Sequence, residues 1–391
     1  MLFPSVAAPP RCAPLDPTPL ARFPLFTHPS MRRILHYTPG PTDFTAEISD
    51  RAVAGAWFEL NRLGGCSAGE LRLKDGFPDR HSIDIGDWIA FDVSPEERWY
   101  LGRVESRQSR SPAGVVFRLE GMGVALNEVF PGGFHPTADG RPPHRYAATD
   151  LFFNDPDYPI ETFDSVNAAD DVVKLLLQQY VTAATPIGYD PANVEPAIDA
   201  GEVVSLKFRG EESVRAALKE LALRARNASW GVDEHGDFFF FQPRAATLAT
   251  WREGHDLLSL EESRERDNLF NRVLLTGDYV YDAPANSDVT ARGFYRWRGN
   301  YTDAVSRDQH GERRIRLWVP WIRTRSDSEA FVREFFRVSA QPTSRYLIEV
   351  ASATLPRPWL GRVRLEDRDG GELITAPVET IRVQFDHTPR F

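Results

Sequence analysis

The sequence predicts a mainly β fold with an α+β insert, in which two antiparallel β-barrels flank a small α/β domain. Aromatic residues make up 12% of the chain, and aromatic side chains pack well on pleated sheets. Short runs of alternating apolar residues recur at close spacing before residue 131 and after residue 245. Apolar residues at helical spacing are concentrated between these two regions.

These observations divide the chain into four parts. A Pro-rich extended arm (1–30) precedes a first β-barrel domain (31–150), an α/β insert (151–245) and a second β-barrel domain with one helix (246–391). A length of 391 residues is expected to hold two to four domains, at roughly 100–200 residues per domain. The hydrophobic content of 42% gives each domain enough apolar residues for a core.

The arm contains eight prolines in its 30 residues. Proline lacks a backbone N–H and has a fixed φ, so this segment is expected to form neither a helix nor a central strand. We expect it to be extended and to lie either along a neighbouring subunit or on its own chain.

Six segments of the first domain alternate or form short apolar runs, separated by Gly, Pro, Asp and Ser. They are RRILHYT, TAEISDRAVAGAWFELN, AGELRLKD, IGDWIAFDV, RWYLGRVESRQ and GVVFRLEGMGVAL. The fourth and fifth segments flank a polar turn and predict a hairpin within residues 86–108. Residues 131–150, rich in Gly and Pro, are predicted to form a loop.

The insert is predicted to hold two helices and a hairpin. The segment DDVVKLLLQQYV has apolar residues at helical spacing, and ESVRAALKELALRA repeats the pattern with Leu218 and Leu221 on the face expected to be buried. The segment SWGVDEHGDFFFFQP predicts a hairpin that turns at Asp233–Gly236.

The second domain returns to strands, with one amphipathic helix in SDSEAFVREFFRVSAQ. DRDGG is predicted to be a hairpin turn between Leu365 and Leu373. The strand segments are NRVLLTGDYV, RGFYRWRG, RRIRLWVPWI, RYLIEVAS, GRVRLED and ELITAPVETIRVQF.

The charge balance is acidic, with a net charge of −10, which argues against a protein that binds nucleic acid by neutralising phosphates. Only four of the basic residues are lysines, either because the genome is GC-rich or because arginine forks are used at interfaces. Two cysteines are too few for a disulfide framework or a zinc site. The sequence contains neither an apolar run long enough to span a membrane nor a convincing secretory signal.

Motifs that carry chemistry are missing from the sequence. The nine histidines are scattered, and neither HExxH nor a Cys/His cluster occurs. GxSxG, P-loop and Rossmann patterns are also absent. We therefore expect no catalytic, cofactor-binding or metal-binding residues and no enzymatic activity.

Paired carboxylates and aromatic residues are the remaining candidates for a site. Asp170–Asp171 and Glu211–Glu212 lie at predicted helix N-termini, where negative charge is favoured without a catalytic role. Six aromatic residues could stack on sugars or fill cores and interfaces, which is the commoner role of Trp. They are Trp99, Tyr100, Tyr295, Trp297, Trp318 and Trp321.

The order of these segments resembles the tail hub proteins of tailed phages, also called baseplate-hub or tail-associated proteins. The resemblance covers residues 31–390, and its most specific elements are ASWGVDEHGDFFFFQP and NRVLLTGD. It implies that the two barrels are tail-tube-like, so that three copies present six barrels in a ring. Such a homotrimer would join the hexameric tail tube to the tail tip and let DNA pass through an acidic or neutral lumen.

The resemblance also implies the partners and the location. The partners would be the tail tube or distal tail protein, the tape measure protein, and tail fibre or tip proteins, with DNA passing without specific binding. The protein would be located in the virion, at the tail tip or baseplate, after assembly in the host cytoplasm. Two alternatives stay open: a distal-tail ring protein with sixfold symmetry, and a carbohydrate-active tail enzyme that cleaves cell wall or polysaccharide.

Overall fold

A computed structural model describes most of the chain. The described residues are 32–110, 114–131, 151–153, 168–197, 206–208, 212–225, 228–282, 293–319, 322, 325–351 and 354–385. The predicted arm (1–30) lies outside them, as does all but the first residue of the predicted loop 131–150.

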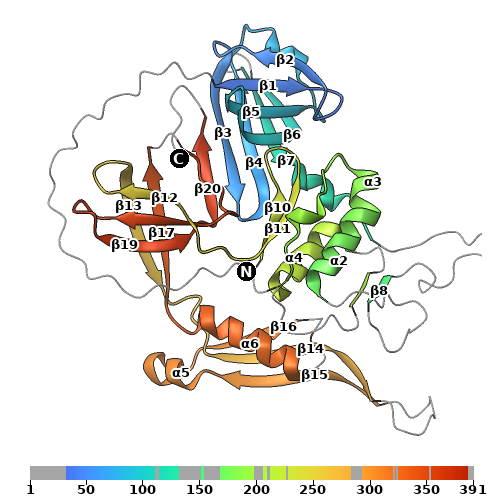
Figure 1. Cartoon of the computed structure of the whole chain (residues 1–391), viewed down its shortest axis with the longest axis vertical. Coiled ribbons are helices and arrows are strands. Elements are labelled where there is room, and N and C mark those ends of the chain that lie inside the picture. The colour runs from blue at the N-terminus through green and yellow to red at the C-terminus, as the bar shows by residue number, and fades with distance from the viewer. Residues whose placement is uncertain are drawn as a thin grey trace, which may run out of the picture.

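A large, mainly antiparallel sheet occupies residues 32–131 (Figure 1). Its strands run in the order β2-β1-β5-β6-β7-β4-β3, and β20 (Thr380–Gln384), from the other end of the chain, pairs with β3. The short helices α1 (Asp79–Ser82) and η1 (Met122–Asn127) follow β4 and β7. The other strands are β1 (Arg33–Tyr37), β2 (Phe44–Ile48), β3 (Val53–Asn61), β4 (Leu63–Leu73), β5 (Trp88–Ser94), β6 (Glu97–Arg110) and β7 (Gly114–Gly121).

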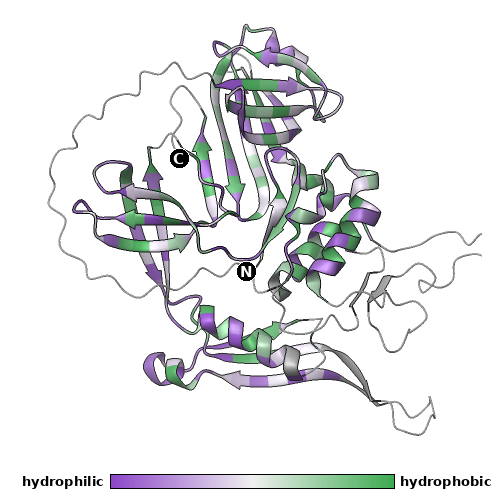
Figure 2. Ribbon diagram, in the orientation of Figure 1, coloured by the Kyte–Doolittle hydropathy of each residue, from purple (hydrophilic) through white to green (hydrophobic). Residues whose placement is uncertain are grey.

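The sheet curls around an aromatic core. Hydrophobic and hydrophilic residues are interspersed along its strands (Figure 2), and alternate apolar residues face the core. The rings of Phe58 and Phe91 lie 5.5 Å apart, and Phe385, just after β20, lies 5.1 Å from Phe91. Ile34 of β1 and Val383 of β20 belong to the same buried cluster, so strands far apart in the sheet order share one core.

The insert packs against the other face of this sheet. Its helices are α2 (Ala169–Leu176) and α4 (Val214–Arg224), and its hairpin is β10 (Ser229–Val232) and β11 (Phe238–Phe241). These elements bury a second core together with residues of β1, β5 and β6. Since both faces of β5 are covered, Trp88–Phe91 is buried throughout and forms a continuous apolar run.

The remaining elements of the insert are short. A π-helical turn η3 (Leu177–Val181) and α3 (Thr182–Ala184) continue α2, and η4 (Pro191–Asn193) follows. β8 (Leu151–Phe153) pairs with β9 (Leu206–Phe208). The two predicted helices and the predicted hairpin are confirmed.

The second β region begins with two small sheets. β12 (Thr247–Arg252), β18 (Arg362–Glu366) and β19 (Glu372–Pro377) form one, and β13 (Leu257–Glu265) and β17 (Thr343–Val350) form a two-stranded ribbon. The predicted DRDGG turn is confirmed, because the N–H of Asp367 donates to the carbonyl of Gly371 at 2.8 Å between β18 and β19. The shared core is Trp251, Leu257, Val350, Val363 and Leu365.

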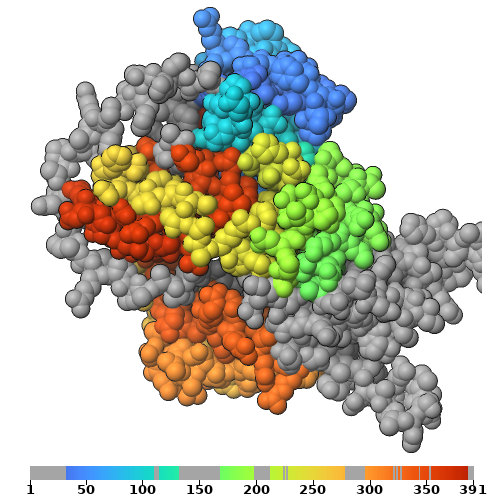
Figure 3. Space-filling model, viewed as in Figure 1, coloured from blue at the N-terminus to red at the C-terminus, as the bar shows by residue number. Residues whose placement is uncertain are grey.

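A third lobe lies between β13 and β17 in sequence. β14 (Arg272–Asp282) pairs with β15 (Gly293–Thr302) and with β16 (Arg314–Trp318). The predicted helix is α6 (Arg325–Ser339), which buries Val332 and Phe335 against one face of this sheet, and α5 (Ala304–His310) is an additional short helix. The lobe forms the end of the molecule opposite β1 and β2 (Figure 3).

The predicted mainly β class with few helices is confirmed. Among the described residues, the strand pairs close neither β region into a barrel, because the first sheet ends at β2 and the second region is split into separate sheets. The two-barrel architecture therefore stays a prediction.

Candidate interaction surface

In the described parts of the chain, the histidine and carboxylates that are buried make hydrogen bonds within the fold. His36 is 1% exposed, and its Nε2 lies 2.9 Å from the carboxylate of Asp87 within the large sheet. The pKa of Asp87 is lowered by hydrogen bonds from the N–H of Asp84 and from Thr38 and His36, which outweigh its burial. No pattern in the sequence distinguishes this buried pair from the exposed histidines.

The carboxylates at the start of α2 make hydrogen bonds that hold this end of the helix. The backbone N–H of Ala168 donates to Asp171 at 3.1 Å. Asp170 is buried and accepts from Lys174 Nζ at 2.8 Å and from the N–H of Ala197 at 2.9 Å. The described residues contain no group of three or more His, Cys, Asp or Glu that could hold a metal ion, and none of the described helices is long and apolar enough to cross a membrane.

The six candidate aromatics do not converge on one cleft. Trp99 and Tyr100 are 2% and 0% exposed in the core of the large sheet, and Trp297 packs against the α6 side of the third lobe. Trp318, by contrast, is 66% exposed. Trp321 and the side chain of Tyr295 lie outside the described part of the structure.

An arginine-rich surface covers the side of the third lobe that α6 leaves open. Alternation along β14, β15 and β16 turns Val273, Leu275 and Ile315 toward α6 and the intervening residues outward. We call this side the arginine face; it consists of Arg272, Leu274, Thr276, Arg296, Arg298, Asn300, Arg314, Arg316 and Trp318.

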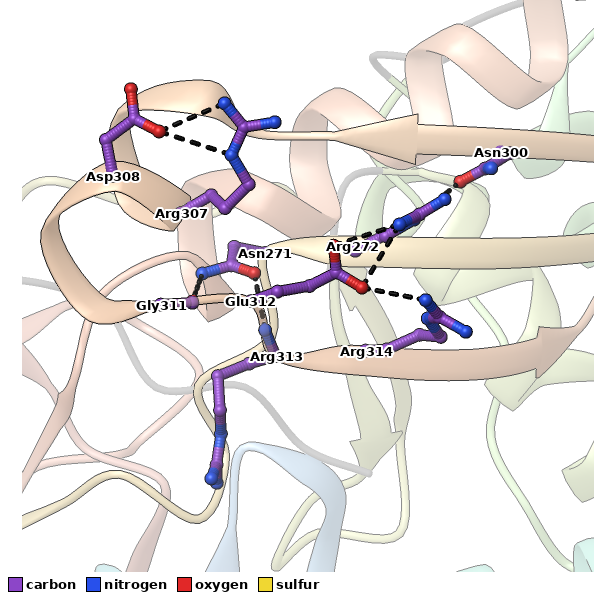
Figure 4. A network of polar contacts seen from close by, with 9 residues as sticks. All are labelled: Asn271, Arg272, Asn300, Arg307, Asp308, Gly311, Glu312, Arg313 and Arg314. Atoms are coloured by element: carbon purple, nitrogen blue, oxygen red, sulfur yellow. Dashed lines mark hydrogen bonds and ion pairs between the residues drawn. The ribbon is translucent and has the colours of Figure 1, made fainter.

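One end of the arginine face is held by a polar network (Figure 4). Glu312 accepts from Arg272 at 2.9 Å and from Arg314 at 2.8 Å, and both contacts lower its pKa. Arg272 also donates from Nε to Asn300 at 3.2 Å, which ties β14 to β15. This glutamate therefore aligns two guanidinium groups on neighbouring strands.

Buried Asn271 fixes the loop that carries Glu312. Its amide nitrogen donates to the carbonyl of Gly311 at 2.8 Å, and its side-chain oxygen accepts from the N–H of Arg313 at 2.8 Å. Because Asn271 is 0% exposed, these bonds replace its contacts with water and set the register of β16 beside β14.

The other end of the arginine face carries Arg296, Arg298 and Arg316 beside Trp318. Among the described residues, no carboxylate lies within ion-pair distance of Arg298 or Arg316. Arg296 lies over the indole of Trp318, with its guanidinium carbon 5.9 Å from the ring centroid. A hollow of about 680 Å³ opens here and is lined by Leu274, Leu275, Thr276, Arg296, Arg298, Gly299, Asn300, Arg316, Leu317 and Trp318.

The arrangement is suited to the recognition of anionic groups. Guanidinium groups bind carboxylates or phosphates through paired hydrogen bonds, and exposed Trp with Arg is typical of interfaces. The signal was present in the alternating R-W-R and R-I-R-L-W segments, but sequence alone does not tell which face of a strand a helix will cover.

Comparisons with known proteins bear on the whole fold. No protein-family model matches the chain, and no curated protein matches it. A tail protein from Neisseria meningitidis MC58 is a solved structure similar to this one, with a TM-score of 0.58 and 12% identity over 92% of this chain and 94% of that chain.

Two prophage proteins are also similar. The 43 kDa tail protein of prophage MuSo2 from Shewanella oneidensis has a TM-score of 0.56 and 13% identity, covering 92% of this chain and 96% of that chain. The prophage tail protein gp18 from Listeria monocytogenes EGD-e has a TM-score of 0.50 and 9% identity, covering 92% and 93%. The resemblance seen in the sequence is thus confirmed at the level of fold: the chain has the fold of phage tail proteins.

Proposed function

We propose that the chain is a structural tail hub or baseplate hub protein that forms a trimeric ring, joins the hexameric tail tube to the tail tip and lets DNA pass. The observation that supports this most is the shared fold with tail proteins, which extends over 92% of this chain and at least 93% of each of three neighbours. A ring of this kind acts through its surfaces, so it requires no catalytic residues.

The symmetry adaptation would come from two tube-like β modules in each chain. The curled sheet of β1–β7 with β20 is the first module, and the sheets of β12, β18 and β19 and of β13 and β17 are the second. Three copies then present six modules, which matches sixfold geometry on one side and threefold geometry on the other. Unpaired strand edges such as β2 are suited to pairing between subunits.

The proposal includes the partners and the place of assembly. The ring would contact the tail tube or distal tail protein, the tape measure protein and the tail fibre or tip proteins. It would be part of the virion at the tail tip or baseplate, after assembly in the host cytoplasm.

Light scattering on the purified chain, together with mass spectrometry of purified tails, tests the proposal. We expect a mass of about three chains at micromolar concentration and three copies per tail. A strictly monomeric chain, or its absence from tails, contradicts the proposal. Steady turnover of peptidoglycan or polysaccharide would instead favour an enzyme.

A further inference from the structure

The ribbon of β13 and β17 has an acidic side that complements the arginine face. Pairing of Glu261 with Leu347 and of Ser259 with Glu349 places these side chains on one side of the ribbon. Leu347 is 66% exposed there. We call this side the acidic ribbon face; it consists of Ser259, Glu261, Ser263, Glu265, Arg345, Leu347 and Glu349.

The two surfaces each hold charges that have no opposite partner within the described chain. No Lys or Arg among the described residues lies within ion-pair distance of the exposed Glu261 or Glu349. Likewise, no described carboxylate lies within ion-pair distance of Arg298 or Arg316. Each surface also exposes a large apolar residue, Leu347 on the ribbon and Trp318 on the arginine face, both at 66%.

The spacing of charged and apolar groups is the same along the strand on the two surfaces and differs across the strands. On the ribbon, Glu349 is two residues along the strand from Leu347, or about 6.6 Å, and Glu261 is across from Leu347 at about 5 Å. On the arginine face, Arg316 is two residues along β16 from Trp318. Arg298 lies in the same cross-strand row as Trp318, two strands away, at about 9.6 Å from it. Long Arg side chains span the difference.

We propose that the acidic ribbon face of one copy of this chain docks on the arginine face of a neighbouring copy, with Leu347 in the hollow beside Trp318 and with Glu261 and Glu349 on Arg298 and Arg316. The proposal rests on the trimer of the proposed function and assigns it an interface. Since the two surfaces differ, the contact is head-to-tail. Each copy uses its acidic ribbon face to bind one neighbour and its arginine face to bind the other. Such contacts close into a ring when the rotation allows it.

A second copy fits these observations better than a nucleic acid does. The net charge of the chain is −10, so its overall field repels phosphate and favours contact only where acidic and basic patches are matched. The hollow beside Trp318 has room for an aliphatic side chain, which the ribbon supplies and a sugar-phosphate backbone does not.

Charge reversal with compensation tests the pairing on the full-length chain by sedimentation velocity. R298E/R316E is expected to raise the concentration at half-assembly at least about tenfold, and E261R/E349R is expected to do the same. The chain carrying all four substitutions restores the charge pairs in swapped form and is expected to assemble within about threefold of wild type.

The matched control is R118E/R333E, which reverses two exposed arginines on β7 and on α6, away from both faces. It should assemble like wild type.

Assembly of R298E/R316E at the wild-type concentration overturns the pairing, as does a four-substitution chain that keeps its melting temperature but does not assemble. Loss of binding to a fluorescent single-stranded oligonucleotide with unchanged assembly would assign the arginine face to nucleic acid. A wild-type chain that stays monomeric contradicts the proposed ring itself.

Discussion

Leu218 and Leu221 show how much one residue in α4 contributes to the fold. They are 0% and 2% exposed in the core between the insert and the large sheet. Replacing either with Ala removes buried apolar contacts and leaves a cavity, so we expect the free energy of unfolding to fall by about 2–5 kcal/mol in urea denaturation. Lys219→Ala, at an exposed position between them, is the control and should change it by less than about 0.5 kcal/mol. Equal effects of the three substitutions would contradict the assigned helix face.

Asp233 in the β10–β11 turn is predicted to make stability depend on pH. Burial and the neighbouring Glu234 raise the pKa of Asp233 to about 6, above the value of about 3.9 in an unfolded chain. At a pH between these two pKa values, Asp233 is protonated in the folded chain and ionised in the unfolded chain. The contribution of Asp233 to stability therefore falls as pH rises from about 4 to about 6. Asp233→Asn removes this loss and keeps an oxygen that accepts from the N–H groups of His235 and Asp237.

We therefore expect Asp233→Asn to gain stability relative to wild type at pH 7 and to match it near pH 4, in denaturation curves at both values. Asp367→Asn is the control, because Asp367 accepts two similar backbone bonds in the β18–β19 turn, away from Glu234. A stability difference for Asp233→Asn that is the same at both pH values would show that the raised pKa is not the cause.

Residue roles were the hardest part to predict from the sequence. Trp99 and Trp318 both lie in strands with alternating patterns, yet the first is buried and the second is exposed. Alternation separates the two faces of a strand but does not tell which of them a distant helix or strand covers. The arginine face is exposed because α6 covers the opposite side of its sheet, and no local pattern in the sequence encodes that contact.

At the scale of elements, the join between β4 and β10 depends on close backbone approach. β10 pairs in parallel with β4 at residues 63–65, and a side chain on Gly65, which has φ of 76°, would place its Cβ 2.0 Å from the carbonyl oxygen of Val232. The close approach of Val232 to β4 at this position therefore requires glycine.

Gly65→Ala is expected to lower the free energy of unfolding by more than about 2 kcal/mol, because it adds both a clash and backbone strain. Gly76→Ala is the control: its φ is 95°, but nothing lies within 4 Å of the added Cβ, so only the conformational cost of about 1 kcal/mol remains. Thermal unfolding monitored by circular dichroism compares the two. Equal losses would mean that the β4–β10 approach does not matter.

Local elements were predictable, but their long-range pairing was not. The hairpins, the two insert helices and α6 follow from periodicity and turn residues that lie close together in sequence. The pairing of β20 with β3 joins residues more than 300 positions apart, and no local pattern encodes it. The same limit explains why the sequence did not show the third lobe as a separate core between β13 and β17.

At the scale of the whole molecule, the two ends of the described chain are tied together. Arg357 pairs with Glu234 at 2.7 Å and also donates to the carbonyl of Arg98 at 3.0 Å, which links the C-terminal region to the insert and to β6. Arg62 of the β3–β4 turn pairs with Glu379 at 3.2 Å beside β20. These buried or partly buried contacts tie the C-terminal region to the insert and to the large sheet.

The central claim is that each chain supplies two β modules to a threefold ring. The most direct measurement is an electron cryomicroscopy map of the tail end of a native particle, averaged separately with threefold and sixfold symmetry. We expect three copies of the chain around a central channel, in which the first module (β1–β7 with β20) alternates with the second (β12, β13, β17, β18 and β19). Six copies in one ring, or a map in which this chain is a single copy away from the channel, would contradict the account.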